Sequence, residues 1–189
     1  MQSFEVRGGK KLFGEITPQG AKNEALQIIS AVLLSPEKIT ISNIPDIVDV
    51  NLLIELLGEM KVKIDRQSRD TCTFQADDVD VDYLHSESYH KKSGKLRGSV
   101  MLAGPLLARF KKAYIPKPGG DKIGRRRLDT HIIGFEKLGA KFLYDTEDGF
   151  FHLETSGLKG TNILLDEPSV TGTANILMAA SLAAGTTTI

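Results

Sequence analysis

The chain has little cysteine, no excess of charge and no long apolar run. Cys72 is the single cysteine among 189 residues, so no disulfide can form within the chain, which fits a reducing compartment. Lysine and arginine number 24, as do aspartate and glutamate, which argues against a nonspecific binder of polyanions. No apolar run could span a bilayer, and the first residues, MQSFEVRGGKK, lack the apolar core of a signal peptide. These absences predict a cytoplasmic protein without nucleic-acid or membrane partners.

The residues that are present suit a globular protein with regular elements. Apolar residues make up 41% and charged residues 25%, enough for a substantial core. Alternating apolar residues on either side of Gly8 and Gly9 predict a small N-terminal hairpin over 4–17. Beyond it, apolar spacing predicts helices over 22–33, 48–60, 97–110, 128–138 and 175–184, and strands over 38–42, 61–65, 71–75, 112–115, 141–144, 151–154 and 186–189.

These predicted elements follow an internal repeat. Ile41, Ile115 and Ile189 stand at equivalent places, each 74 residues after the last. A unit of helix, strand, helix, strand and strand is thus begun three times, at about 21–80, 95–156 and 160–189, and completed twice. The fold class predicted is α/β (α+β) with a truncated third repeat. Because such units cover one another's apolar helix faces, we expect the natural chain to continue beyond Ile189.

One stretch, PKPGGDKIGRRRLDTH from Pro116 to His131, carries the strongest sign of chemistry. Its three glycines let backbone N–H groups approach an anion, and its five cations surround the carboxylate of Asp121. This composition suits either a phosphate-handling loop with one acid or an exposed basic turn. Asp129 and His131 suit metal or acid–base work, or hydrogen bonds that orient the loop. Orientation is favoured, because no third metal ligand is evident, and no metal or cofactor is expected.

Four motifs taken together resemble one family. They are GAKNEAL at 20–26, LRGSVMLAGPLLARF at 96–110, the loop described above and PSVTGTANILMAASLAAGTTTI at 168–189. This combination is similar to the UDP-N-acetylglucosamine 1-carboxyvinyltransferase family of enolpyruvyl transferases. The resemblance implies an inside-out barrel of two domains with three repeats each and an active site between them. Residues 1–20 would be a hairpin belonging with an absent second domain, and 21–189 an incomplete first domain.

The resemblance also implies substrates and site residues. The substrates are phosphoenolpyruvate and UDP-N-acetylglucosamine, and the base and further arginines come from the absent C-terminal domain of the same chain. Asp121 takes the position of the proton donor, where many members have cysteine. Lys22, Arg97 and Arg126 match phosphoenolpyruvate contacts; lysine at a helix N-terminus is electrostatically misplaced unless an anion lies beside it. The nucleotide sugar matches Asn23, Arg97, Arg126, Arg127, Leu128, Asp129, Thr130, Ser169 and Val170.

Asp121 is also the main departure from the family pattern. An aspartic acid is mostly ionised at neutral pH, and the surrounding cations favour ionisation further, so the donor role requires closure of the loop over bound anions. Two other functions remain open. One is the sister enolpyruvyl transferase acting on shikimate 3-phosphate. The other is a nucleotide-sugar binding module without turnover, should the natural chain end at Ile189.

Overall fold

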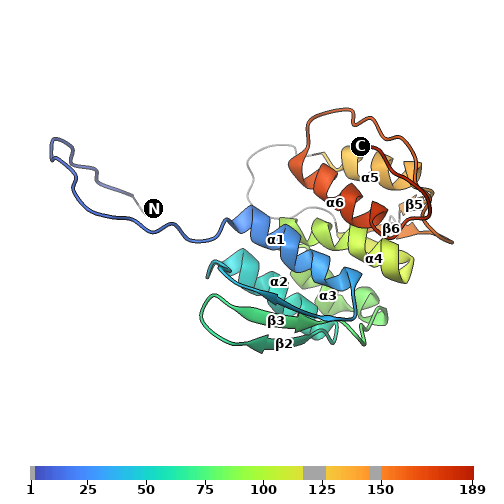
Figure 1. The fold of residues 1–189 in the computed structure, drawn as a ribbon, viewed down its shortest axis with the longest axis horizontal. Coiled ribbons are helices and arrows are strands. Elements are labelled where there is room, and N and C mark those ends of the chain that lie inside the picture. The colour runs from blue at the N-terminus through green and yellow to red at the C-terminus, as the bar shows by residue number, and fades with distance from the viewer. Residues whose placement is uncertain (1–2, 117–126, 145–149) are drawn as a thin grey trace.

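The computed structural model describes residues 3–116, 127–144 and 150–189 and contains two complete repeat units (Figure 1). The first unit consists of α1 (Lys22–Ala31) with the 3-10 turn η1 (Val32–Leu34), β1 (Lys38–Ile41), α2 (Val48–Glu59), β2 (Lys63–Arg66) and β3 (Cys72–Gln75). The second consists of the 3-10 helix η3 (Arg97–Leu102), α4 (Ala103–Phe110), β4 (Lys112–Pro116), α5 (Asp129–Lys137), β5 (Lys141–Tyr144) and β6 (Phe150–Glu154). Between them lie η2 (Asp82–His85) and α3 (Glu87–Ser93), and α6 (Val170–Ala180) follows the second unit.

Each unit forms a three-stranded antiparallel sheet with the same strand order. The orders are β1-β3-β2 and β4-β6-β5, so the last strand of each unit lies in the middle. Lys38 pairs with Gln75 in the first sheet, and Lys112 pairs with Glu154 at the equivalent place in the second. Cys72, predicted as a strand residue, begins β3 and is fully buried. The predicted fold class and the repeat are therefore confirmed.

Helices fill the middle of the molecule because their apolar stripes cover one another. α4 packs against α6, and α1 packs against both η3 and α6, so the first helices of the three units meet, with the sheets outside them (Figure 1). Ile29, Leu53, Leu107 and Ile176 are completely buried in this core. The helices of one unit thus complete the core of the next, as the repeat predicts.

The N-terminal arm differs from its prediction. Residues 3–20 carry no helix or strand, so the predicted hairpin strands were wrong. Its apolar side chains, which suggested strands, are fully or almost fully exposed; Phe4 and Phe13 are examples. In Figure 1 the arm leaves the body of the protein, and none of the described strands β1 to β6 pairs with it. Its assignment to a second domain stays a prediction.

Three further predictions need correction. The helix predicted over 97–110 is divided into η3 and α4, and α6 begins at Val170 rather than at Asn175, because Ser169 caps it. The strand predicted over 186–189 is reduced to parallel bridges, Lys159 with Ala184 and Asn162 with Thr188. The structure also forms η2 and α3 over 82–93, where the sequence analysis predicted no helix.

Candidate functional site

The first turn of α1 carries two of the predicted site residues, Lys22 and Asn23. The Lys22 ammonium lies 2.8 Å from a carboxylate oxygen of Asp49. The side chains of Lys22 and Asp49 are 44% and 42% exposed to solvent. Asp49 belongs to the first turn of α2, where the helix dipole favours a negative charge. The anion that a lysine at this place requires is thus supplied, in this structure, by Asp49. Asn23 is exposed on the same turn.

Arg97 begins η3, and the packing of the next residue sets where it lies. A Cβ atom on Gly98 would stand 2.8 Å from Cδ1 of Leu26, so glycine allows η3 to approach α1 closely. Arg97 is therefore held, half-buried, beside the helix that carries Lys22 and Asn23. Burial and, after it, the charge of Arg97 lower the pKa of His131 on α5.

The first turns of α5 and α6 bring together the predicted nucleotide-sugar residues. Ser169 caps α6 by accepting a hydrogen bond from the Gly172 amide at 3.1 Å. Thr130 is buried and donates from Oγ1 to Asp166, 3.0 Å away. A Cβ atom on Gly172 would lie 2.9 Å from Cγ2 of Thr130, so glycine is needed where the two turns touch. Thr130 and Ser169 thus lie on adjoining turns.

The remaining residues of this group differ in exposure. Arg127 forms an ion pair with Asp129, which raises the pKa of the guanidinium. Leu128, just before α5, is buried, whereas Val170 is 77% exposed. Leu128 therefore anchors the segment, and the charged pair on either side of it is accessible. Asp121 and Arg126, the predicted proton donor and phosphate-binding arginine, lie outside the described residues.

His131 is buried at the base of this group. Its Nδ1 lies 3.0 Å from Nδ2 of Asn175, and its Nε2 lies 3.4 Å from Oγ1 of Thr171. Burial, and then the charge of Arg97, lower the pKa of His131 to about 4. A neutral, hydrogen-bonded imidazole orients the chain at this place. Within residues 3–116, 127–144 and 150–189, no group of three His, Cys, Asp or Glu side chains could hold a metal ion.

Three residues of this arrangement were missed by the sequence analysis. Asp49 holds Lys22, Asp166 holds Thr130, and Asn175 holds His131. Asp49 and Asp166 are ordinary acidic residues in the sequence, and the residues around them give no sign that they bind Lys22 and Thr130. Asn175 carried a usable signal, because an asparagine inside the apolar run of α6 is rarely buried without hydrogen-bond partners.

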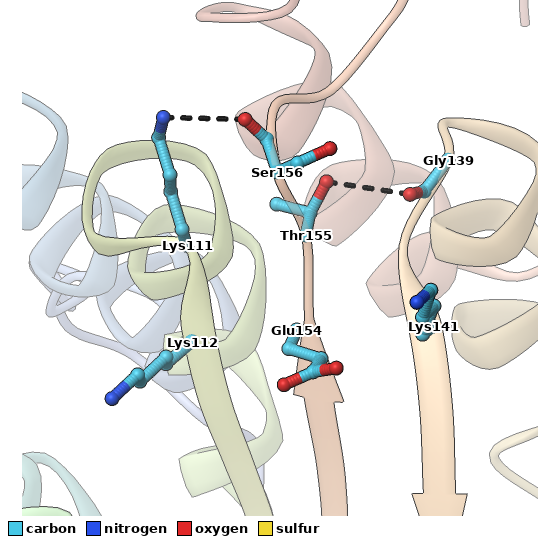
Figure 2. Close-up of a pocket in the computed structure, with 7 residues that line it drawn as sticks. All are labelled: Lys111, Lys112, Gly139, Lys141, Glu154, Thr155 and Ser156. Atoms are coloured by element: carbon cyan, nitrogen blue, oxygen red, sulfur yellow. Dashed lines mark hydrogen bonds between the residues drawn. The ribbon is translucent and has the colours of Figure 1, made fainter.

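A separate hollow of about 320 Å³ lies at the end of the second sheet where β4 and β5 begin and β6 ends (Figure 2). Lys111, Lys112, Lys141 and Glu154 line it, together with Gly139, Thr155 and Ser156. Glu154 lies opposite both Lys112 and Lys141 in the strand register, and Lys111 donates to the carbonyl of Ser156. The strand register therefore explains why these charged residues lie together, and none of the predicted site residues lines the hollow.

Known proteins are similar in sequence to this chain along its whole length. The curated proteins named UDP-N-acetylglucosamine 1-carboxyvinyltransferase from Bacteroides thetaiotaomicron and Porphyromonas gingivalis are each 60% identical to it over 189 residues. They align with 100% of this chain, which spans only 44% of their length. The protein of the same name from Borreliella burgdorferi is 41% identical. The resemblance predicted from the four motifs is thus confirmed.

Solved structures confirm the fold. The enolpyruvyl transferase NikO from Streptomyces tendae is similar with a TM-score of 0.76 at 21% identity, over 95% of this chain and 41% of that one. An EPSP synthase from Acinetobacter baumannii gives 0.63 at 17% identity, over 90% of this chain and 38% of that one. Among the described residues, no helix is both long enough and apolar enough to cross a membrane. A model of the EPSP synthase (3-phosphoshikimate 1-carboxyvinyltransferase) family matches residues 6–189, and the chain therefore belongs to this family.

Proposed function

We propose that this chain is part of an enzyme that transfers the enolpyruvyl group of phosphoenolpyruvate to the 3′-hydroxyl of UDP-N-acetylglucosamine and releases phosphate. The observation that carries the proposal is the 60% identity, over every residue of the chain, to proteins named for this reaction. Those relatives are more than twice as long, so the activity is assigned to the protein at its native length. The reaction would serve peptidoglycan synthesis, and through it cell shape and division, in the cytoplasm.

The chemistry defines what the site must supply. The acceptor oxygen bonds to C2 of phosphoenolpyruvate while C3 takes a proton. The resulting tetrahedral intermediate then loses phosphate as the C2–O bond to phosphate breaks and C3 gives up a proton, which restores the C2–C3 double bond. Cations must hold the phosphate and the carboxylate, an acid must protonate C3, and a base must take the hydroxyl proton. The base and further cations are assigned to the second domain.

The described residues support a division of labour between two places. Lys22, half-exposed beside Asp49, and Arg97, on the neighbouring helix η3, are assigned to phosphoenolpyruvate together with Arg126. A lysine already paired with one carboxylate can exchange it for an anionic substrate at little cost, because exposed ion pairs are weak. The nucleotide sugar is assigned to the turns of α5 and α6 and to residues near them. Its proposed contacts are Asn23, Arg97, Arg126, Arg127, Leu128, Asp129, Thr130, Ser169 and Val170.

The two turns are suited to a diphosphate. The N-terminus of a helix presents unpaired N–H groups and the positive end of its dipole, and the first turns of α5 and α6 adjoin at Thr130 and Gly172. Arg127 precedes α5 and adds a guanidinium that can exchange Asp129 for phosphate oxygens. Two helix ends with an arginine therefore favour a nucleoside diphosphate ligand over an uncharged sugar.

The first experiment separates this function from its two alternatives. Phosphate release from phosphoenolpyruvate is measured at native length, with UDP-N-acetylglucosamine and shikimate 3-phosphate as separate acceptors. We expect release with the nucleotide sugar alone. Release only with the shikimate ester would identify the sister enzyme, and binding of the nucleotide sugar without release would identify a binding module.

The second experiment tests Asp121 as the proton donor. Asp121→Asn keeps the size of the side chain but removes its acid, so turnover should fall by about a thousandfold while UDP-N-acetylglucosamine still binds, as general acid catalysis predicts. Asp78→Asn, at an exposed position in the first unit, is the matched control and should leave turnover unchanged. Turnover within tenfold of the wild type in Asp121→Asn would exclude this residue as the donor.

A further inference from the structure

The side chain of Asn175 joins three elements in the middle of the molecule. It belongs to α6 and is completely buried. Its Oδ1 accepts a hydrogen bond from the Gly104 amide at 2.7 Å, and its Nδ2 donates to the Val100 carbonyl at 2.8 Å. An uninterrupted α-helix would pair these two backbone groups with each other. The amide of Asn175 therefore occupies the break between η3 and α4.

The third contact of Asn175 fixes the proton of His131. Nδ2 of Asn175 also lies 3.0 Å from Nδ1 of His131. Because the amide oxygen already accepts from Gly104, the amide nitrogen must donate both to Val100 and to His131, so Nδ1 is an acceptor. The ring proton is then on Nε2, which faces the hydroxyl of Thr171 at 3.4 Å. A doubly protonated ring would direct an N–H group at the amide NH₂, so the arrangement requires neutral His131.

We propose that His131 and Asn175 form a neutral positioning pair that holds the first turn of α5 against the first turn of α6. The inference rests on the proposed function, because these two turns carry Thr130 and Ser169, which are assigned to UDP-N-acetylglucosamine. The pair acts through these residues and is not itself catalytic. Both residues lie within the family motifs, and the contact between them adds a positioning role that the proposed ligand contacts do not include.

The charges around the pair keep it neutral. Burial opposes a positive charge on His131, and Arg97 on η3 opposes it further. No residue of α6 is charged. The other charged groups on the elements packed against the pair are Asp129, Glu136 and Lys137 of α5, Arg109 of α4, Lys22 and Glu24 of α1, Lys141 of β5, and Asp166 and Glu167 before α6. Asp129 is paired with Arg127, and Asp166 accepts from Thr130, so neither carboxylate is bonded to the imidazole.

Two substitutions of His131 separate the contact with Asn175 from the contact with Thr171. His131→Asn places an amide oxygen near the position of Nδ1, where it can accept from Asn175. His131→Gln places its amide near the position of Nε2 and leaves the Asn175 donor without an acceptor. At native length we expect His131→Gln to raise the KM for UDP-N-acetylglucosamine about tenfold, and His131→Asn to change it less than about threefold. The KM for phosphoenolpyruvate is the internal control and should change little in either variant.

The outcomes distinguish the pair from a simple packing role. An equal rise of the KM in both variants, or no rise in either, would overturn the proposal. The tautomer provides a second readout, because ¹⁵N NMR of the imidazole at pH 7 should show an unprotonated Nδ1, and a protonated Nδ1 would also overturn it. A wild-type enzyme without activity on UDP-N-acetylglucosamine would contradict the proposed function alone, since the tautomer would still decide on the pair.

Discussion

The two complete repeat units share a strand order but differ in what covers the outer face of their sheets. In the first sheet this face is polar: Thr40 and Thr73 lie opposite each other and share a hydrogen bond of 2.9 Å. In the second sheet the equivalent pair is Tyr114 and His152, whose rings meet edge to face at 4.5 Å. The outer face of the first sheet can therefore face water, whereas the aromatic outer face of the second sheet needs other residues to cover it.

The segment between the units provides that cover. His85 of η2 is within 2.7 Å of the Tyr114 hydroxyl, and His90 of α3 stacks on Phe150 at 3.9 Å. On its other side, α3 binds the first unit through Lys92, which forms ion pairs with Glu55 and Glu59 of α2. η2 and α3 thus join the units at a place where a simple repeat has only a connection.

The units also differ at the end where the proposed site lies. The first helix of unit one is a regular α-helix that ends in a 3-10 turn, whereas the first helix of unit two is split where Asn175 enters it. The connection after the first strand covers residues 42–47 in unit one and 117–128 in unit two. The comparison teaches that the repeat supplies the scaffold, and that the segment proposed to carry the proton donor lies where unit two departs from unit one.

The largest expected effect tests the split helix. A Cβ atom on Gly104 would stand 2.4 Å from the backbone oxygen of Asn175 and 2.5 Å from its Oδ1. Gly104→Ala should therefore lower the free energy of unfolding by about 3 kcal/mol or more, because backbone must move to admit the methyl group. Urea unfolding of the protein at native length measures the change.

A helical glycine of unit one is the control for this substitution. The nearest atom to a Cβ on Gly58 is Cδ1 of Ile64, at an ordinary contact distance of 3.4 Å. Gly58→Ala should be neutral or should stabilise the protein by up to about 1 kcal/mol, since alanine favours a helix. If both substitutions had the same effect, the close approach of α6 to α4 would not restrict residue 104.

Most of the scaffold could be predicted from sequence, because it follows local apolar spacing. The bounds of β5 match the prediction, and the other named strands differ by one or two residues. The break at Gly104 could not be predicted, because its cause, Asn175, is 71 residues away in sequence. α3 was missed because its polar residues outnumber its apolar ones, although Ser86 caps it and Tyr89 is completely buried.

The candidate site was less predictable than the scaffold. Lys22, Thr130 and Ser169 were found through the family motifs, and their positions at helix starts agree with anion binding. Their partners Asp49 and Asp166 are set by tertiary packing between helices that the sequence does not place relative to each other. The physical argument that Lys22 needs an anion was sound, but it indicated a substrate where this structure has a carboxylate of the protein itself.

The next expected effect separates the units by their response to acid. Residues 22–75 contain no histidine, whereas unit two holds the buried His131, whose pKa is lowered to about 4. The unfolded state takes up this proton below about pH 6.5, and the folded state only near pH 4, so stability falls as the pH is lowered through this window. The loss from His131 should reach about 3 kcal/mol at pH 4.

The variant His131→Asn isolates this contribution. It has no titrating side chain at residue 131, so its free energy of unfolding should fall less between pH 6.5 and pH 4 than that of the wild type. All other side chains are common to both proteins, so their contributions cancel in the difference, which urea unfolding at a series of pH values provides. Parallel curves over this window would show that His131 does not resist protonation.

The smallest expected effect tests the cover of the second sheet. The hydroxyl of Tyr89 donates to the Tyr114 carbonyl at 3.0 Å, and because burial raises its pKa, it stays protonated at neutral pH. Tyr89→Phe removes this buried donor and should lower the free energy of unfolding by about 1 kcal/mol. On the outer face of the first sheet, Thr73→Val removes an accessible hydroxyl and should change it by less than about 0.5 kcal/mol. An equal or larger loss of unfolding free energy in Thr73→Val would contradict the comparison. The hydrogen bonds on the polar face of the first sheet would then stabilise the protein as much as the contact between α3 and the second sheet does.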